Sequence, residues 1–531
     1  MKAFKRNKKS KFIFGAVLVA SVFILSSLMI SCKNKDDDDD VVTPQFIITQ
    51  VTDKSAQELL DDLKKDASGK TNADTDPEYS VVHGDTENEH DTTEFDYSAI
   101  ENQLTENFNT LRQEAIDSGD VTQADATSQN ASASYMIRTW TYEYWTKAAN
   151  GERIKASGTV SLGYAKFPIY GEWWPKLNYV VIHPHYTKTA DKEMPSKDKS
   201  TVSDTAIMQQ LAANDAMIIS PDYEGYGSTS SRKHPYLMHD ALSKQCVDML
   251  ESVMTWYKNK GYQNLKFRGF EDNWDLYTFG YSQGGSQALA IQKYIETDSS
   301  VSQELKNHLR GSVCGAGPYD PVATYKWYLQ QDKVSYPVIF PLVLDGYISN
   351  YQNSYLKGYK LEDFLTERMF QKVDCPDGDR LSPVEALRSK KYDAHKIGAI
   401  IAKAYGHTSE RDVTVAEVLT ADAKNLDSEA SKAVFKALEA NSLVDGKWTP
   451  QHNIIFYHSY QDDVVPIVNY ENAKKAFEGS GKLVQKYQKL FHQSAYNSNG
   501  IKMGRHSSEG AWFYANYVFK NRDFKNLKKT N

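Results

Sequence analysis

The sequence predicts an α/β fold: a mostly parallel sheet with helices on both faces and a helical insertion late in the chain. Three observations predict it. Short apolar runs alternate with amphipathic segments from Tyr135 onward, as in parallel strands joined by helices. A glycine-rich turn at 280–284 joins one of these runs to a helical segment. About 135 residues between Gly317 and Asn453 show helical patterns but no clear buried strand.

The chain is too long for a single ordinary domain, so we expect a core with additions. Its 531 residues carry a net charge of −7, and 40% of them are hydrophobic, which is a globular composition. No basic stripe is present, which argues against a nucleic-acid partner. The predicted parts are a leader at 1–32, an acidic tether with a small helical segment at 33–130, core at 131–320, a helical cap insertion at 321–450 and further core at 451–531.

The first residues have the organisation of a secretion signal. Lysine and arginine are frequent before Phe12, and residues 12–30 form a nearly unbroken apolar run. Ser31 and Cys32 follow, which resembles a bacterial lipobox, although Met29 stands where leucine is usual. Cleavage there leaves Cys32 as a lipid-modified N-terminus. The alternative is an uncleaved transmembrane anchor, because the run is almost long enough to span a bilayer.

Five aspartates at 36–40 make a dense charged run after the lipobox. Such a run cannot bury itself, so it predicts a solvated tether. Acidic residues directly after a lipidated cysteine also resemble the surface-export signal of some Gram-negative lipoproteins. We therefore expect lipid anchoring to the bacterial cell envelope, at the outer membrane, and the acidic run favours display on its outer face.

Three cysteines remain when Cys32 is lipidated, so at least one of them is unpaired. The spacing of Cys246, Cys314 and Cys375 matches no zinc motif. Cys246 and Cys314 fall in apolar runs, where cysteine is most simply a small core residue.

The individual elements follow from the periodicity of the apolar residues. Residues 56–65 and 97–116 are expected to be helical, and 136–146 with 154–162 form a predicted hairpin around Asn150-Gly151. The core strands are expected at 179–182, 216–220, 276–280, 309–315, 453–457 and 484–491, and the core helices at 206–214, 238–258, 284–296 and 508–519. The insertion is interpreted as a cap over the site, with a packing extension away from it as the alternative.

The strongest local signal is the segment GYSQG at 280–284. It follows a strand and precedes a helix, which is the context of a nucleophile elbow, where glycines let the turn tighten until the serine hydroxyl projects. From Tyr135 to its end the chain resembles the α/β-hydrolase superfamily in this respect. The resemblance implies that Ser282 is a catalytic nucleophile.

A serine hydroxyl needs a base and a carboxylate that orients the base, and this superfamily has the chain order serine, acid, histidine. The segment HSYQDDVVP at 458–466 resembles the family's H-G-x-x-D-x-x-V-P, with Ser459 in place of glycine. Asp462 aligns with the acid, and Asp463 is its rival. His506, in a Gly-x-His sequence before the last helix, is the predicted base, and His492 is its rival.

An oxyanion hole needs two preorganised donors. The resemblance implies the backbone N–H of Gln283 for one of them. For the other we expect the N–H of Tyr186, because HYT at 185–187 resembles the H-G-T of related esterases, with tyrosine in place of glycine. The alternative is that this segment is only a loop with two buried histidines.

Further segments narrow the resemblance to bacterial secreted esterases related to the secretory lipases. They are PDYEGYGS at 221–228, HPYL at 234–237 and GPYD at 317–320. In that family the first of these shapes the loop beside the site, so Asp222 is interpreted as structural.

The predicted activity is hydrolysis of a small-molecule carboxylic ester through an acyl-enzyme, with no metal or cofactor. A peptidase is the rival enzyme class. A β-propeller, as in the prolyl oligopeptidases, does not fit in the preceding residues, whereas an aminopeptidase with acidic groups in its cap, at Glu362, Asp363 or Glu367, stays open. A surface lipoprotein that binds a partner on an inactive scaffold is the non-enzyme alternative, against which the intact serine, acid and histidine argue.

Overall fold

The computed structural model describes most of the predicted core and insertion. The described residues are 46–55, 58, 61, 106, 109–122, 134–167, 170–199, 203–209, 212, 215–259, 267–459, 462–484, 490–491 and 505–514. They belong to one compact unit, Thr43–Asn531. The predicted leader with Cys32, most of the acidic tether and His492 lie outside the described residues.

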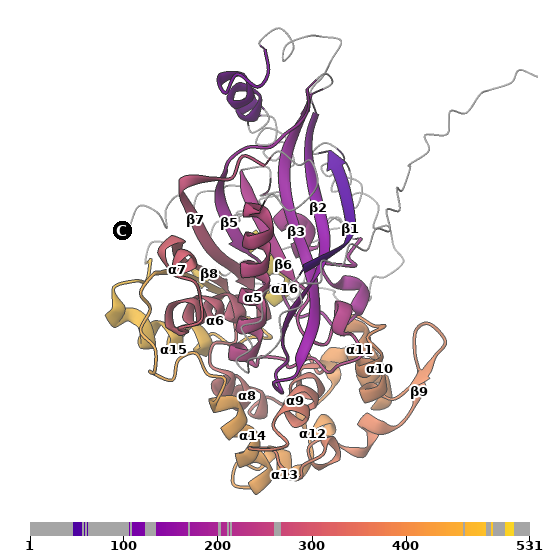
Figure 1. The fold of residues 1–531 in the computed structure, drawn as a ribbon. Helices are drawn as coiled ribbons and strands as arrows, with labels where there is room; N and C mark the ends of the chain where they lie inside the picture. The colour runs from indigo at the N-terminus through magenta and orange to yellow at the C-terminus, as the bar shows by residue number, and fades with distance from the viewer. Residues whose placement is uncertain are drawn as a thin grey trace, which may run out of the picture. The chain divides into compact units, whose positions relative to one another are not determined.

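A single twisted sheet forms the centre of the core (Figure 1). The order of its strands is β1-β2-β3-β6-β5-β7-β8-β11-β12, and β4 pairs with β3. The first pairs, as far as β3 with β6, are antiparallel, and all the later neighbours are parallel. The strands are β1 Phe46–Ser55, β2 Ser134–Lys147, β3 Arg153–Phe167, β4 Gly171–Trp173, β5 Leu177–Ile182, β6 Ala216–Pro221, β7 Phe270–Tyr281, β8 Leu309–Gly315, β11 Asn453–Ser459 and β12 Leu490–Phe491.

The mostly parallel sheet confirms the predicted fold class. β2 and β3 form the predicted hairpin, and Gly151, at a φ of 88°, provides the left-handed residue that its turn requires. The strand expected at 309–315 is β8 without any change of bounds. Because parallel strands end at the same edge of a sheet, the loops after β5, β7 and β11 meet there.

Helices cover both faces of the sheet, because successive side chains of β6 pack against helices on opposite sides. Its Met217 and Ile219 pack in the hydrophobic cluster that contains α5 (His239–Lys258) and residues of α6 (Gln283–Thr297). Its Ala216 and Ile218 pack in the opposite cluster, with α4 (Asp204–Gln209) and α16 (Arg505–Tyr514). A strand buried on both sides reads as a continuous apolar run, which is how the sequence predicted it.

The region expected to be only a tether and a helical segment also contains a strand. β1 pairs antiparallel with β2 along ten residues at the edge of the sheet. The prediction missed it because the middle of β1 is exposed and carries polar residues between Ile48 and Ser55, so the apolar alternation is weak. In the predicted helix at 97–116, residues 109–117 are helical, and Leu111 and Ala115 are buried against the core.

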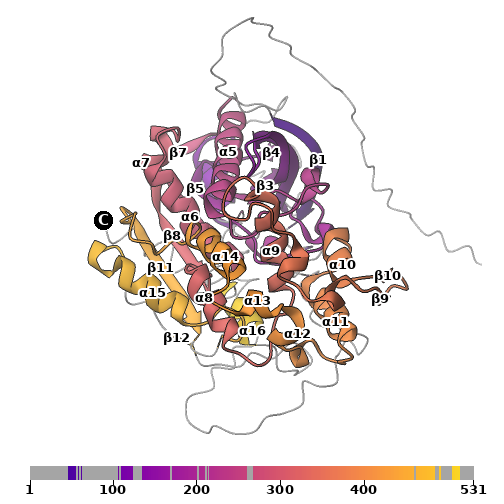
Figure 2. The ribbon, with the colours of Figure 1, turned by 90° about the horizontal axis from the view of Figure 1, so that it is seen from below.

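The chain between β8 and β11 forms a helical insertion with its own hydrophobic core. Figures 1 and 2 show its helices together at one end of the sheet. A short hairpin of β9 (Val373–Asp374) and β10 (Arg380–Leu381) interrupts them. The helices are α8 Pro321–Leu329, α9 Ile339–Asn350, α10 Pro383–Ser389, α11 Ala394–Ala404, α12 Val415–Val418, α13 Ala421–Lys424 and α14 Glu429–Glu439. Side chains of Ser382, Asp393 and Ser428 cap three of them.

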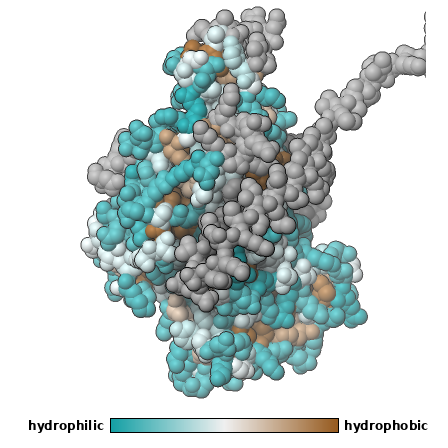
Figure 3. Space-filling view, in the orientation of Figure 1, coloured by the Kyte–Doolittle hydropathy of each residue, from teal (hydrophilic) through white to brown (hydrophobic). Residues whose placement is uncertain are grey.

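The described surface is mostly polar. Figure 3 shows hydrophobic residues on one face only in small, scattered groups. The described large hydrophobic residues that are exposed are Val51, Tyr170, Tyr355 and Leu426. Cys246, Cys314 and Cys375 are buried and unpaired. Within the described ranges, no helix combines the length and the apolar character that crossing a bilayer requires.

Replacement of a core aromatic residue tests this packing. Phe279 of β7 is fully buried and stacks on Phe513 of α16, with ring centroids 4.8 Å apart. Phe279→Ala is expected to destabilise the protein by about 3–5 kcal/mol, because it removes apolar contact area and leaves a cavity. The measurement is the shift of the urea unfolding midpoint. Leu426→Ala, at an exposed position, is the control, and an equal shift in both variants would contradict the described packing.

Candidate active site

Ser282 occupies a strained turn between β7 and α6. Its φ of 57° lies in the left-handed region, which a non-glycine residue rarely adopts. Its N–H donates to the carbonyl of Gly315 at 2.8 Å. A Cβ atom on Gly284 would lie 2.2 Å from the Pro184 carbonyl oxygen, so the turn fits against the loop after β5 only with glycine there. The local geometry is that of the predicted nucleophile elbow.

Three predicted residues meet at the carboxyl edge of the sheet. Ser282 Oγ lies 2.8 Å from Nε2 of His506, and Nδ1 of that imidazole lies 2.7 Å from Asp462 Oδ2. A carboxylate only accepts, so Nδ1 carries the proton and Nε2 accepts the hydroxyl proton of Ser282. Ser282, His506 and Asp462 thus form one continuous line of hydrogen bonds.

In the acid loop, residues 462–466 after β11, Asp462 and its neighbour Asp463 make different contacts. Oδ1 of Asp463 accepts the backbone N–H of His506 at 3.1 Å, whereas Asp462 meets the imidazole. The helix expected to begin at Ser508 begins at Arg505, so His506 lies in the first turn of α16 rather than in a loop before it. The sequence missed this because no N-capping side chain precedes the helix in the GRHS segment.

The Asp462 carboxylate is buried and fully engaged. Its Oδ1 accepts the backbone N–H groups of Val464 and Val465, at 2.9 and 2.7 Å. Burial by itself raises the pKa of Asp462, but the charge and the hydrogen bond of His506 outweigh it, so the pKa lies below its usual value. The group is therefore held as a carboxylate, the form that orients an imidazole.

The structure separates the two predicted oxyanion donors. Gln283 is the first residue of α6, so its N–H has no acceptor within the helix. The N–H of Tyr186 donates to Asp204 Oδ2 at 3.1 Å. That hydrogen bond contradicts the prediction for Tyr186, since a donor engaged by a buried carboxylate is not offered to a substrate oxygen.

Sequence reasoning missed the buried ion pair beneath this loop. Lys188 Nζ lies 2.9 Å from Asp204 Oδ1 and also donates to the Glu193 carbonyl. Burial raises the pKa of Asp204, but its contacts, the neighbouring charge of Lys188 first among them, together lower it by more, and the resulting pKa is about 2. The two side chains are sixteen residues apart, and lysine is so rarely buried that no sequence signal marks such a pair.

Neutral histidines surround the site. Burial lowers the pKa of His183 and of His239 to about 4, and the pKa of His185 and of His234 to about 3. His234 accepts a hydrogen bond from the side chain of Gln283 at 2.8 Å, because its Nδ1 donates to the Glu224 carbonyl. These imidazoles are hydrogen-bonded parts of the core and are not placed to exchange protons with Ser282.

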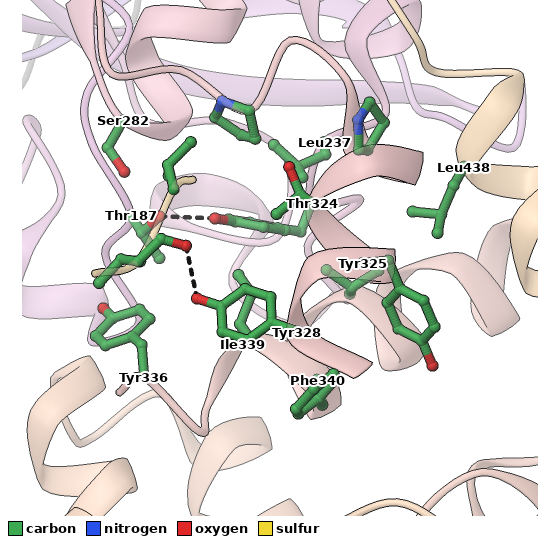
Figure 4. A pocket seen from close by; sticks show the side chains of 16 residues that line it. Thr187, Leu237, Ser282, Thr324, Tyr325, Tyr328, Tyr336, Ile339, Phe340 and Leu438 are labelled. Carbon is green, nitrogen blue, oxygen red and sulfur yellow. Dashed lines mark hydrogen bonds between the residues drawn. The ribbon is translucent and has the colours of Figure 1, made fainter. Parts of the chain in front are cut away.

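A pocket opens beside Ser282; the empty space between its walls and in its mouth is about 560 Å³, a figure that includes open solvent. Figure 4 shows Tyr328, Tyr336 and Phe340 around it, with Ser282 at its edge. None of the described residues that line it carries a charge. Its walls come from α8, α9 and α14 of the insertion and from loops of the core; the lining residues are Thr187, Tyr236, Leu237, Ser282, Pro318, Pro321, Thr324, Tyr325, Tyr328, Tyr336, Ile339, Phe340, Val343, Leu438, Val464 and Val465. Side chains of the insertion therefore form part of the pocket wall beside Ser282.

The other predicted polar residues lie elsewhere. Glu362, Asp363 and Glu367 do not line the pocket; Asp363 caps its own turn at Lys360. Asp222 accepts hydrogen bonds from Ser157 and from a backbone N–H, so it ties loops together as expected. Among the described residues, no group of histidine, cysteine or carboxylate side chains is arranged to hold a metal ion.

Comparison with known proteins agrees with this architecture. Neither the protein-family models nor the curated proteins contain a match to the sequence. Among solved structures, the rice cell wall degrading esterase LipA from Xanthomonas oryzae is similar, with a TM-score of 0.51 and 20% identity over 76% of this chain and 92% of that chain. A protein of Legionella pneumophila described as a hydrolase is similar with a TM-score of 0.50 and 16% identity, over 79% of this chain and 96% of that chain. The chain has the α/β-hydrolase fold.

The buried histidines predict how stability depends on pH. His239 has a pKa of about 4 in the folded chain and about 6.5 when unfolded, so the unfolded chain binds more protons between these values. Stability from this group is present above pH 6.5 and is lost as the pH falls toward 4. His239→Gln lacks this titration, so wild type loses stability from this group with falling pH while the variant does not. The difference in unfolding free energy between the two proteins therefore shrinks by about 1.4 kcal/mol for each pH unit below 6.5.

The measurement is a series of urea titrations of both proteins at pH 7, 6 and 5. Phe279→Ala, which removes no titratable group, is the control and keeps a constant offset from wild type. A His239→Gln offset that is equally independent of pH would show that the imidazole is not held neutral by burial.

Proposed function

We propose that this protein is a serine hydrolase that cleaves carboxylic esters, with Ser282 as nucleophile, His506 as base and Asp462 as the orienting acid. One observation carries the proposal: the line of hydrogen bonds from Ser282 Oγ through His506 to Asp462, with lengths of 2.8 and 2.7 Å. Nucleophile, base and orienter within hydrogen-bond reach are the arrangement that nucleophilic catalysis requires. Its position at the carboxyl edge of an α/β-hydrolase sheet adds support.

The chemistry follows from this arrangement. Ser282 Oγ attacks the ester carbonyl carbon while His506 Nε2 takes the hydroxyl proton, and Asp462 stabilises the resulting imidazolium. Collapse of the tetrahedral intermediate breaks the bond to the alcohol oxygen, which receives the proton from His506, and leaves an acyl-enzyme. Water then attacks the acyl carbon with the same base, which releases the acid and restores Ser282.

The oxyanion of that intermediate needs two N–H donors. Gln283 N–H, at the start of α6, is the first in this proposal. Thr187 N–H replaces Tyr186 as the second, because Thr187 lines the pocket that contains Ser282, whereas the N–H of Tyr186 is engaged by Asp204. The buried Lys188–Asp204 pair then holds the loop that presents this donor.

The pocket indicates an ester with a hydrophobic part. Uncharged aliphatic and aromatic side chains make its wall, and such surface favours an acyl chain or an aromatic group over a charged one. An aminopeptidase needs a carboxylate for the substrate amine, and none of the described lining residues supplies one. The similar LipA is an esterase, and the resemblance to secretory-lipase-like enzymes points the same way.

The predicted lipid anchor completes the proposal. We propose that Cys32 becomes the lipid-modified N-terminus and that the aspartates at 36–40 belong to a tether on the outer membrane of the cell envelope. The basic residues, apolar run and Ser31-Cys32 sequence support it. A tethered hydrolase acts on substrates that reach the envelope.

The nucleophile is tested first by ester hydrolysis. Wild type is expected to hydrolyse p-nitrophenyl esters and to favour octanoate over acetate, because the pocket is apolar. Ser282→Ala is expected to lower kcat by about 10⁴-fold or more, since removal of the nucleophile abolishes the covalent route. Ser286→Ala, one turn along α6, is the matched control and keeps most of the activity. Equal rates for wild type and Ser282→Ala would refute the proposed nucleophile.

The anchor is tested in a Gram-negative host that expresses the full chain. Wild type is expected to incorporate an alkyne-labelled fatty acid and to partition into the detergent phase of Triton X-114. Cys32→Ser removes the thiol that receives lipid, so label and partitioning are lost, whereas the control Cys375→Ala, at a buried unpaired thiol, keeps both. Fatty acid that remains on Cys32→Ser would rule out this anchor.

A further inference from the structure

The Asp463 carboxylate is shared between the predicted base and the cap. Its Oδ1 accepts the backbone N–H of His506 at 3.1 Å, and its Oδ2 lies 3.2 Å from Nη1 of Arg411. Arg411 belongs to a short 3-10 helix of the insertion, Glu410–Asp412. One planar group therefore connects α16 to the cap, and a displacement of either partner is transmitted to the other.

The hydrogen bond from the His506 N–H to Asp463 lies in the first turn of α16. The first N–H groups of a helix lack intrahelical acceptors, and a carboxylate there both satisfies one of them and interacts favourably with the helix dipole. His506 is the second residue of α16, so this bond helps to set where the helix begins. The orientation of the imidazole toward Ser282 depends on that start.

The cap holds the same acid loop at two more points. Tyr328 of α8 donates to the Val464 carbonyl at 2.7 Å, and the Ser335 hydroxyl donates to the carbonyl of Asp463. Tyr328 and Val464 also line the pocket, whereas Arg411 does not. Three side chains of the insertion thus contact the loop that supplies Asp462.

We propose that Asp463 and Arg411 are positioning residues through which the cap sets the geometry of His506. The inference rests on the proposed function, because it assigns the cap a part in the same reaction. Neither residue touches the reacting atoms: Asp463 acts through the backbone of His506, and Arg411 acts through Asp463. The cap is then a part of the catalytic apparatus as well as a wall of the pocket.

The expected kinetic effect lies in kcat. Arg411→Ala lowers kcat roughly threefold to tenfold and leaves KM nearly unchanged, since a partly exposed ion pair is weak but small displacements of a base are costly to the rate. Asp463→Ala loses both contacts and lowers kcat further, by about tenfold to a hundredfold. Asp463→Asn keeps an oxygen for the N–H of His506 but loses the ion pair with Arg411, so its kcat is expected to fall about as far as that of Arg411→Ala.

A double-mutant cycle isolates the coupling. If Arg411 acts through Asp463, Arg411→Ala has no further effect on kcat in the Asp463→Ala background. Asp412→Asn is the matched control: it removes the Lys333–Asp412 ion pair on the same 3-10 helix without reaching the acid loop, so kcat stays at the wild-type value. Urea midpoints of all variants show whether a loss of rate merely follows a loss of stability.

The outcomes separate this inference from the function on which it rests. Strictly additive effects in the cycle, or an equal loss in Asp412→Asn, would overturn the coupling while wild type and Ser282→Ala still differ. A raised KM at constant kcat would also overturn it, since that result marks Arg411 as a substrate contact. A wild type that neither hydrolyses esters nor reacts with a serine-directed phosphonate refutes the function itself, and the coupling with it.

Discussion

The site depends on how closely the start of α6 approaches its neighbours. A Cβ atom on Gly284 would lie 2.2 Å from the Pro184 carbonyl oxygen, and one on Gly285 would lie 2.1 Å from that of Gly315. These contacts press the helix onto the ends of β5 and β8, and Ser282 is left with a left-handed φ of 57°. Strain of this kind costs about 1–3 kcal/mol and persists only where surrounding structure imposes it. Here the strained residue holds its hydroxyl 2.8 Å from Nε2 of His506.

Local patterns were sufficient for most elements of the core and for the strained turn. A buried parallel strand is a continuous apolar run, so β8 and β6 were predictable, and glycines around a serine between a strand and a helix predicted the elbow. Asp462 and Asp463 illustrate what such patterns cannot predict. The aligned motif favoured Asp462 for the imidazole, but only the fold shows that Asp463 meets the backbone of His506. β1 was missed because an exposed edge strand needs no strong apolar alternation.

Tyr186 was mispredicted because a buried charge determines its partner. Asp204 is fully buried, and a carboxylate away from water needs hydrogen-bond donors from the protein. Lys188 Nζ and the Thr205 N–H serve one oxygen, and the Tyr186 N–H serves the other. Resemblance of the HYT segment to a known motif carries no information about Asp204, which lies eighteen residues from Tyr186 and reaches it only in the folded chain. The next residue, Thr187, is consequently the one exposed to the pocket.

The contacts between the cap and the core differ in how far their side chains are exposed to water. Near β6, the Lys390 ammonium donates to the carbonyls of Gly225, Ser230 and Arg232, and the Asp345 carboxylate, only 8% exposed, pairs with Lys233 and Arg388.

At the acid loop, the Arg411 side chain is 41% exposed and that of Asp463 is 22% exposed. Salt screens exposed pairs more than buried ones, so rising ionic strength weakens the Arg411–Asp463 contact. If the cap sets the geometry of His506 through that pair, kcat falls with salt in wild type, and it does so less in Arg411→Ala, where the pair is already absent.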